Sequence, residues 1–220
     1  ANDTAMKMVW YYQAARGKPE KRKIISRRRG YHGVTMAAAS MTALAYAQNG
    51  FGLPLDFVKH TTTPDYYNEG RDGESEAEFT ARCAAELEAL IIEEGPETVG
   101  ALFAEPVMGA GGVIIPPAGY FAAIREVLER HDVLLVADEV ICGFGRTGEM
   151  WGSQTMDVRP DMLTCAKALS SAYLPISAVL MSDRVYDTLA GKAESLGIFG
   201  HGYTYSCLLY TSDAADETTG

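Results

Sequence analysis

The sequence is poor in the residue spacings that build metal sites and disulfide frameworks. Its four cysteines show no Cys-x-x-Cys spacing, and its four histidines show no ligand spacing with one another or with cysteine. We therefore expect no metal site, and we interpret the cysteines as reduced, small core residues. The residues concerned are Cys83, Cys142, Cys165, Cys207, His32, His60, His131 and His201.

Long apolar runs and an excess of positive charge are also missing. No run reaches the length of a transmembrane helix, and the first residues show no signal-peptide pattern. The formal net charge is -10, which argues against nucleic acid or an anionic membrane as a partner. With 220 residues, of which 47% are hydrophobic and 22% charged, the chain can build one sizeable globular core. We expect a cytoplasmic setting.

What the sequence does contain is a series of apolar runs that end in polar residues. The run 133–137 ends at Asp138 and Glu139, and the run 99–104 ends at Glu105. Runs without proline or charge are typical of strands buried on both faces of a parallel sheet. Helical patterns alternate with these runs, so we predict an α/β fold with a mostly parallel sheet flanked by helices. The predicted helices include 75–94 and 120–131.

The first third of the chain gives local predictions. Residues 2–16 carry apolar residues at helical spacing, and residues 35–46 are rich in small helix formers, so both predict helices. The stretch 50–71 is rich in Gly, Pro, Asn and Thr and predicts a surface loop. The basic stretch 21–29 contains a short strand, 23–26. We interpret its charges as a solvated surface turn, because no aromatic residues alternate with them.

An acid and a lysine stand at the ends of neighbouring apolar runs. Asp138 closes one run, and Lys167 follows the next run, with the glycine-rich turn 143–148 between them. Polar residues at the carboxyl ends of parallel strands lie where open α/β sheets bind their ligands. The pair suits pyridoxal 5'-phosphate, which forms a Schiff base with a lysine and pairs its pyridinium nitrogen with an acid.

The same stretch resembles the class III (fold type I) pyridoxal-phosphate-dependent aminotransferases. The resemblance runs from Ala1 to Ser206, and it implies the large cofactor domain of that fold, truncated at both ends. It also implies a homodimer that moves an amino group from a primary amine or ω-amino compound to pyruvate or a similar 2-oxo acid. The family pattern DEV…GFGRTG…PD…AK appears at residues 138–140, 143–148, 160–161 and 166–167.

The resemblance also assigns roles to single residues. Lys167 is expected to form the Schiff base and to shuttle a proton, while Asp138 pairs with the pyridine nitrogen. Tyr31 is expected to stack on the ring, and Val140, two residues beyond Asp138 on the same strand face, to pack on its other side. The other expected cofactor contacts are His32 as a supporting residue, Glu105, Ala1 and Asn2 from a phosphate-binding segment, and Thr204, which reaches the phosphate across the dimer.

Position 110 bears on the substrate. Class III enzymes that act on ornithine or GABA usually carry a glutamate there, paired with a mobile arginine, whereas this chain has Ala110. The segment 105–113 is similar to the amine–pyruvate (ω-transaminase) branch. Other class III transaminases or aminomutases, of the diamine, β-alanine or GABA type, remain the alternative.

The resemblance stops after Ser206. Residues 207–217 resemble a translated sequencing adapter, so we interpret 207–220 as a non-native tail and 1–206 as a partial cofactor domain. We expect the fragment by itself to be inactive, since part of the phosphate-binding segment and a carboxyl-terminal domain would be absent.

Two interpretations of other classes compete with the aminotransferase. Gly143, Gly145 and Gly148 satisfy G-x-G-x-x-G after a strand, the fingerprint of NAD-dependent dehydrogenases. That fingerprint opens a helix and is followed, about 20 residues on, by an acid beyond a second strand. Here the nearest acids, Asp157 and Asp161, precede the next strand. The other interpretation is a non-enzymatic fragment or binding module.

Overall fold

A six-stranded sheet forms the centre of the protein. The computed structural model describes residues 1–202, and the strands lie in the order β2-β1-β3-β4-β5-β6. Every neighbouring pair is parallel except β5 and β6, which are antiparallel. The predicted mostly parallel α/β sheet is therefore confirmed. The strands are β1 (Lys23–Arg27), β2 (Val58–Thr61), β3 (Val99–Ala104), β4 (Leu134–Asp138), β5 (Met162–Cys165) and β6 (Ala178–Met181).

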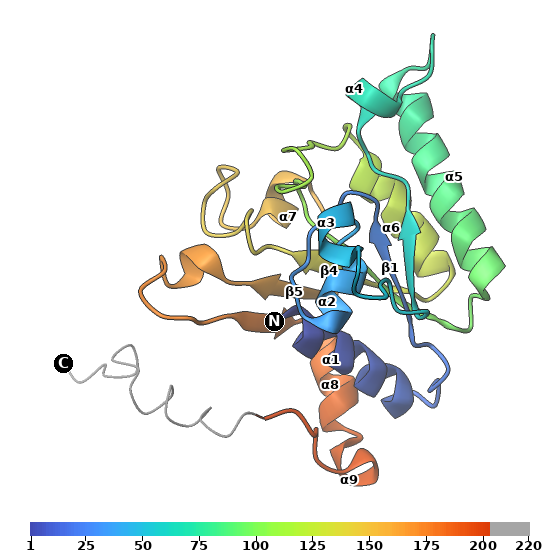
Figure 1. Ribbon diagram of the computed structural model, residues 1–220. Coiled ribbons are helices and arrows are strands. Elements are labelled where there is room, and N and C mark those ends of the chain that lie inside the picture. The colour runs from blue at the N-terminus through green and yellow to red at the C-terminus, as the bar shows by residue number, and fades with distance from the viewer. Residues whose placement is uncertain (203–220) are drawn as a thin grey trace.

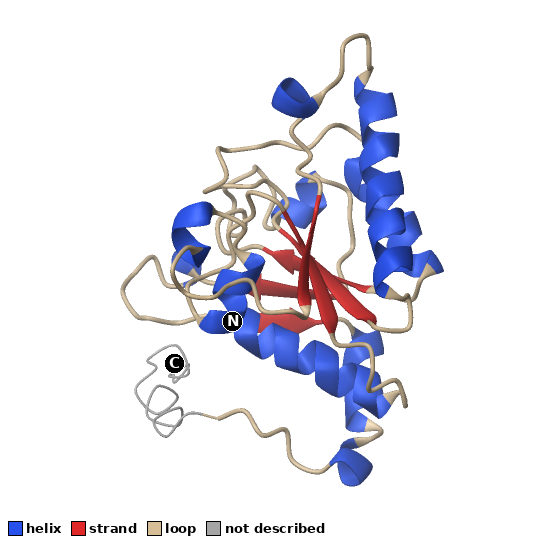
Figure 2. Ribbon diagram, turned by 45° about the vertical axis from the view of Figure 1, so that its right-hand side comes forward, coloured by secondary structure: helices blue, strands red, loops and turns tan. Residues whose placement is uncertain are grey.

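Helices cover both faces of the sheet (Figures 1 and 2). On one face α5 (Glu76–Glu94) and α6 (Tyr120–Arg130) lie side by side, and on the other α1 (Asn2–Ala15) packs with α8 (Asp183–Ala190). Within residues 1–202, no helix combines the length and the apolar character needed to cross a membrane. The shorter helices are α2 (Met36–Met41), α3 (Ala45–Gln48), α4 (Tyr66–Glu69), α7 (Gly152–Thr155), the 3-10 turn η1 (Lys167–Leu169) and α9 (Ala193–Leu196).

The alternation of side chains along β4 separates two hydrophobic cores. Leu135 packs in the core under α5 and α6, whereas Leu134 and Val136 pack in the core under α1 and α8. Successive residues of a strand point to opposite faces. Asp138 therefore falls on the α1 side of the sheet, where the amino-terminal residues of that helix can reach it.

The parallel register brings the polar strand ends to one edge. Ala104 of β3 pairs with Ala137 of β4, and Asp138 pairs with Thr164 of β5. Glu105 follows Ala104 directly, and Lys167 begins η1 just beyond β5. The carboxylates and the lysine singled out from the sequence thus share the carboxyl edge of the sheet, as predicted.

The glycine-rich stretch 143–148 opens no helix. Residues 139–150 form turns and bends, and the next helix, α7, has only four residues. The turn therefore does not lead directly into a helix whose free amide groups could bind a dinucleotide phosphate. The dehydrogenase interpretation is wrong for this reason.

The prediction of a solvated turn at residues 21–29 is wrong for two of its cations. Lys21 is 3% exposed and Arg27 1%. The Nζ of Lys21 donates to the carbonyl oxygens of Pro96 at 2.8 Å and His131 at 3.1 Å. β1 lies between β2 and β3 inside the sheet, so neighbouring loops cover the residues at its two ends. The local amino-acid composition does not reveal this burial.

Two neighbouring predictions are wrong in detail. The predicted helix 35–46 is divided into α2 and α3, because Thr42 adopts an extended backbone and its hydroxyl donates to Gly33 O at 2.9 Å. The predicted loop 50–71 contains β2 and α4. Pairing of β2 with β1, in the register Ile24 to Val58, stabilises a strand that the polar composition of the segment concealed.

We predict that the two adjacent isoleucines of α5 differ sharply in their effect on stability. Ile91 is 0% exposed and Ile92 59%. Ile91→Ala should lower the free energy of unfolding by about 2–5 kcal/mol, because it leaves a cavity in the core. Ile92→Ala, the matched control on the same helix, should change it by less than about 1 kcal/mol. Urea unfolding followed by circular dichroism measures both, and equal losses would contradict the assignment of the buried face.

Candidate active site

A small hollow at the carboxyl edge of the sheet collects most of the predicted site residues. It measures about 90 Å³. Five separate segments contribute to it: the start of α1, the loop after β1, the end of β3, the end of β4, and the residues after β5. Its lining residues are Asn2, Tyr31, His32, Gly33, Glu105, Asp138, Val140, Ile141 and Lys167.

The carboxylate of Asp138 is buried and accepts three hydrogen bonds. Its Oδ2 accepts from Asn2 Nδ2 and from His32 Nδ1, both at 2.8 Å, and its Oδ1 accepts from the backbone N–H of Val140 at 3.1 Å. An ionised carboxylate has about four acceptor positions. One position therefore remains for a further donor.

These contacts decide the charge of Asp138. Burial alone would raise the pKa of its carboxyl group, because a charge is poorly solvated in the interior. The hydrogen bonds and positive character of His32, together with the donors of Asn2 and Val140, outweigh burial and hold the pKa below its ordinary value. The structure therefore presents an ionised carboxylate beneath the hollow.

Asn2 connects this carboxylate to the rest of the fold. Its Nδ2 also donates to the carbonyl of His32 at 2.7 Å, and its Oδ1 accepts from Thr164 Oγ1 at 2.8 Å. Both N–H donors of the side-chain amide are thus engaged, and within residues 1–202 the backbone N–H of Asn2 has no partner and is available for the predicted phosphate contact. The role of Thr164 could not be predicted from the sequence, because it depends on the register of β5 against β4.

Lys167 stands at the start of η1 with an unusual backbone. Its φ is 42°, in the left-handed region that a residue with a Cβ rarely occupies. The side chain is exposed, and within residues 1–202 it makes neither a hydrogen bond nor an ion pair. Such backbone strain often accompanies functional positions. The ammonium group is free to bind a ligand in the hollow.

The carboxylate of Glu105 fixes the opposite wall of the hollow. Its Oε1 accepts from the backbone N–H of Tyr31 at 3.1 Å, and its Oε2 from that of Gly109 at 2.9 Å. It therefore holds the loop after β1 against the loop after β3. Tyr31, which is half-buried, lines the hollow as part of this wall.

The remaining predicted residues fall into three groups. Val140 lines the hollow, but β4 ends at Asp138, so a turn places it there and the strand-face argument was wrong. Ala1 lies outside the lining, and its amino group donates to Ser177 Oγ at 3.4 Å. Thr204 and the tail 207–220 lie outside the described residues.

Glu139 has a role that the sequence did not reveal. It is 0% exposed, and its two carboxylate oxygens accept from the backbone N–H groups of Gly152 at 2.9 Å and Ser153 at 2.7 Å. It thereby ties the glycine-rich turn after β4 to the start of α7. The only signal in the sequence was its place beside Asp138.

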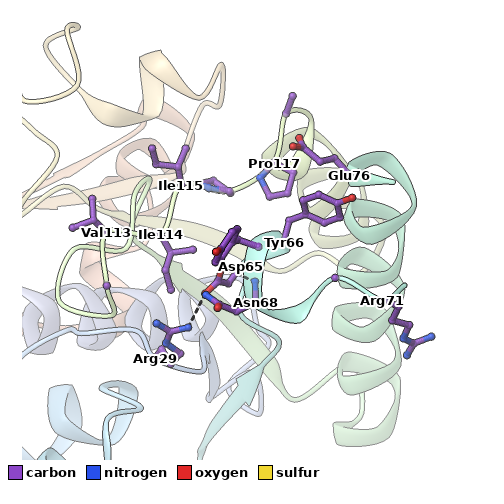
Figure 3. Close-up of a pocket in the computed structure, with 15 residues that line it drawn as sticks. Arg29, Asp65, Tyr66, Asn68, Arg71, Glu76, Val113, Ile114, Ile115 and Pro117 are labelled. Carbon is purple, nitrogen blue, oxygen red and sulfur yellow. Dashed lines mark hydrogen bonds and ion pairs between the residues drawn. The ribbon is translucent and has the colours of Figure 1, made fainter. Parts of the chain in front are cut away.

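A larger hollow of about 860 Å³ lies beside this edge, between residues 65–71 and 112–118 (Figure 3). Its one buried charge is satisfied: Asp65 accepts from Arg29 Nη1 at 2.7 Å and from Asn68 Nδ2 at 2.7 Å. Arg29 also donates to the carbonyl of Gly111 at 2.6 Å. Its lining contains no lysine, so the acid–lysine chemistry belongs to the smaller hollow.

The residues of the small hollow fit pyridoxal phosphate chemically. Asp138 supplies a buried anion with an open acceptor position, Lys167 an amine that has no partner within residues 1–202, and Tyr31 and Val140 an aromatic and an apolar side chain. Within residues 1–202, no group of three or more histidine, cysteine or acidic side chains could hold a metal. A mostly parallel sheet that presents an acid and a lysine at adjacent strand ends defines an α/β protein of the pyridoxal-phosphate-binding class.

Comparison with known proteins gives the family. Residues 1–211 match the model of the class III aminotransferases, and the chain belongs to this family. Over 206 residues, 94% of the chain, it is 53% identical to gamma aminobutyrate transaminase 1, mitochondrial, of Solanum lycopersicum. It is 50% identical over the same length to vanillin aminotransferase of Capsicum frutescens. The chain spans 40% and 45% of these two relatives. Because relatives include mitochondrial and chloroplastic proteins, the cytoplasmic setting stays a prediction.

Solved structures agree with the family. A structure described as a transaminase with L-ala superposes with a TM-score of 0.90 at 55% identity, over 93% of this chain and 48% of that one. The ω-transaminase of Pseudomonas jessenii in complex with PMP also has a TM-score of 0.90, at 52% identity, over 93% and 45% of the two chains. Class III aminotransferases use pyridoxal 5'-phosphate, and it is the cofactor that this family assigns to the site.

We predict that Asp138 makes the stability of the fold depend on pH. A depressed pKa in the folded state stabilises the protein above the ordinary aspartate pKa, and this contribution is lost as the pH falls through the folded value. The difference in unfolding free energy between the wild type and Asp138→Asn should therefore shrink below about pH 4. Urea titrations at several pH values measure it.

The matched control for this prediction is Glu126→Gln on α6. Glu126 is exposed and has neither a hydrogen bond nor an ion pair in the described part of the chain. Its replacement should leave the pH profile of the wild type unchanged. A difference between wild type and Asp138→Asn that stays constant from neutral to acid pH would contradict the assigned charge of Asp138.

Proposed function

We propose that the protein to which this chain belongs transfers an amino group from a primary amine or ω-amino compound to pyruvate or a similar 2-oxo acid. The observation that carries the proposal is the buried Asp138 carboxylate, which accepts three hydrogen bonds and shares one hollow with Lys167. When bound, pyridoxal phosphate supplies an aldehyde that carries the amino group and a ring that delocalises negative charge.

Asp138 acts on the ring nitrogen in this proposal. A carboxylate kept ionised by His32, Asn2 and Val140 stabilises a proton on the pyridine nitrogen through close opposite charge. Asp138 would thereby keep the ring of a bound cofactor able to take up negative charge from the reacting carbon. His32 and Asn2 act through Asp138, since both donate to its Oδ2.

Lys167 holds the cofactor and moves the proton. Its amine would hold the cofactor through its aldehyde carbon, with loss of water, when no substrate is present, and as a free amine it would act as a general base. As the base, its Nζ takes the proton from the carbon that carries the substrate nitrogen and returns it on the cofactor side. Its exposed side chain and its lack of a competing partner within residues 1–202 support this assignment.

Tyr31 and Val140 orient the ring between them. The stacking of an aromatic side chain on one face and an apolar contact on the other would exclude water from the reacting plane. Glu105 supports this arrangement, because its carboxylate fixes the backbone of Tyr31. Ala1, the backbone of Asn2, and Thr204 from a second subunit remain our proposed phosphate contacts.

Ala110 supports the amine–pyruvate branch. A methyl group at this exposed position cannot pair with an arginine, as a glutamate would. The solved ω-transaminase of Pseudomonas jessenii is 52% identical to the chain, but gamma aminobutyrate transaminase 1 of Solanum lycopersicum is 53% identical. A GABA-type enzyme is therefore the second candidate function.

The chain spans less than half the length of these relatives. We propose that residues 1–206 are part of a larger cofactor domain, that 207–220 are a non-native tail, and that the active protein is a homodimer. The two experiments below accordingly use the full-length protein that carries this chain.

We predict that Lys167→Ala abolishes covalent attachment of pyridoxal phosphate. Within residues 1–202, Lys167 is the one lysine that lines the hollow, so no neighbour can replace it. Intact-mass spectrometry after borohydride reduction should find the added mass in the wild type and in the control Lys192→Ala, and not in Lys167→Ala. Retention of the added mass by Lys167→Ala would contradict the assignment of Lys167 as the residue that binds the cofactor covalently.

We predict a preference for pyruvate over 2-oxoglutarate as amino acceptor. Ala110 has no carboxylate that could form an ion pair with a mobile arginine. With a simple primary amine as donor, kcat/KM should be at least about tenfold higher for pyruvate, equivalent to about 1.4 kcal/mol. Better use of 2-oxoglutarate would favour the ornithine- or GABA-type enzymes that usually carry a glutamate at this position.

A further inference from the structure

Arg27, at the carboxyl end of β1, is a buried cation that the chemistry above does not use. Its side chain is on the α6 face of the sheet, where the guanidinium carbon lies 5.9 Å from the ring centroids of both Tyr120 and Phe121. Its Nη2 donates to the backbone carbonyl of Glu105. Within residues 1–202, Arg27 has no ion pair, and its Nε and Nη1 have no hydrogen-bond partner.

Such an arrangement does not favour stability. A guanidinium keeps its charge inside a protein, and a buried charge without a counter-ion costs free energy. Replacing buried charges by apolar groups of similar volume is often neutral or stabilising. The two aromatic rings offset part of this cost, but they leave Nε and Nη1 unsatisfied. Stability therefore does not explain the presence of Arg27, and its hydrogen bond to Glu105 is the contact that can carry a function.

That bond places Arg27 behind the wall of the small hollow. The backbone of Glu105 is held by Arg27, while its carboxylate on the opposite face holds the N–H groups of Tyr31 and Gly109. The carbonyl of Arg27 also accepts from Gly30 N at 3.0 Å, which closes the turn that leads to Tyr31. One residue thus contacts both loops that form the wall.

We propose that Arg27 is a positioning residue for the cofactor: it fixes the backbone of Glu105 so that the Glu105 carboxylate can hold Tyr31 and Gly109 in place. The proposal rests on the proposed function, because it assumes that Tyr31 contacts pyridoxal phosphate. Arg27 itself does not line the hollow.

Lys21 provides a matched control at the other end of the same strand. It is also a buried cation, 3% exposed, that donates to backbone carbonyls, those of Pro96 and His131. It precedes β1, whereas Arg27 ends it, so it lies at the edge of the sheet away from the hollow. Lys21→Met and Arg27→Met remove the same kind of group from opposite edges.

The experiment compares the wild type, Arg27→Met, Arg27→Lys and Lys21→Met in the full-length protein. It measures the Kd of pyridoxal 5'-phosphate by fluorescence quenching, the Tm, and the hydrogen exchange of the Tyr31 and Gly109 amides in the cofactor-free protein. We expect Arg27→Met to raise the Kd about tenfold, comparable to the loss of one hydrogen bond, and to speed exchange at both amides. Arg27→Lys keeps a donor for the Glu105 carbonyl, so its Kd and its amide exchange rates should lie closer to those of the wild type.

The control should behave differently. Lys21→Met should lower the Tm, while its Kd stays within about twofold of the wild type and both amides exchange at the wild-type rate. The proposal is overturned if exchange at Tyr31 and Gly109 is unchanged in Arg27→Met. It is also overturned if, for the same fall in Tm, the Kd rises as much in Lys21→Met as in Arg27→Met. A wild type that binds no pyridoxal phosphate would instead overturn the proposed function, while the exchange rates still test the link from Arg27 to Tyr31.

Discussion

Keeping a carboxylate ionised inside the protein is the constraint on which the rest of the site depends. Burial disfavours the charge of Asp138, so the fold must supply donors at hydrogen-bonding distance. These donors come from the start of α1, from the loop after β1 and from the turn after β4. Asn2 lies 136 residues from Asp138 in the sequence and His32 lies 106 residues away. The charge state of the site is thus a product of the assembled fold.

The sheet determines where the acid and the lysine lie relative to each other. Adjacent parallel strands end at one edge, and alternation puts Asp138 on the face that α1 covers. Lys167 lies just after the neighbouring strand, β5, and its backbone is strained. The chain leaves the direction of β5 at this residue. The strand β4 therefore holds the acid, and a short irregular segment after β5 carries the lysine.

The glycine-rich turn shows how one pattern can serve two different structures. In a dinucleotide-binding protein it would begin a helix and leave free amide groups for phosphate. Here the carboxylate of Glu139 occupies amide groups at the start of α7, and the glycines lie in turns. An anion from the protein itself thus takes the position at a helix start that a bound phosphate takes in the other fold.

The sequence by itself determined a mostly parallel sheet, the polar residues Asp138 and Lys167 at or just beyond the ends of two strands, and the family, because apolar runs that end in polar residues are local patterns. Tertiary structure alone decided the burial of Lys21 and Arg27, the strand β2 inside a polar stretch, and the place of Val140 in a turn. It also decided that Asn2 and Thr164 support Asp138. These features depend on which strands pair and which loops cover their ends, and such contacts between distant residues leave no periodic pattern along the chain.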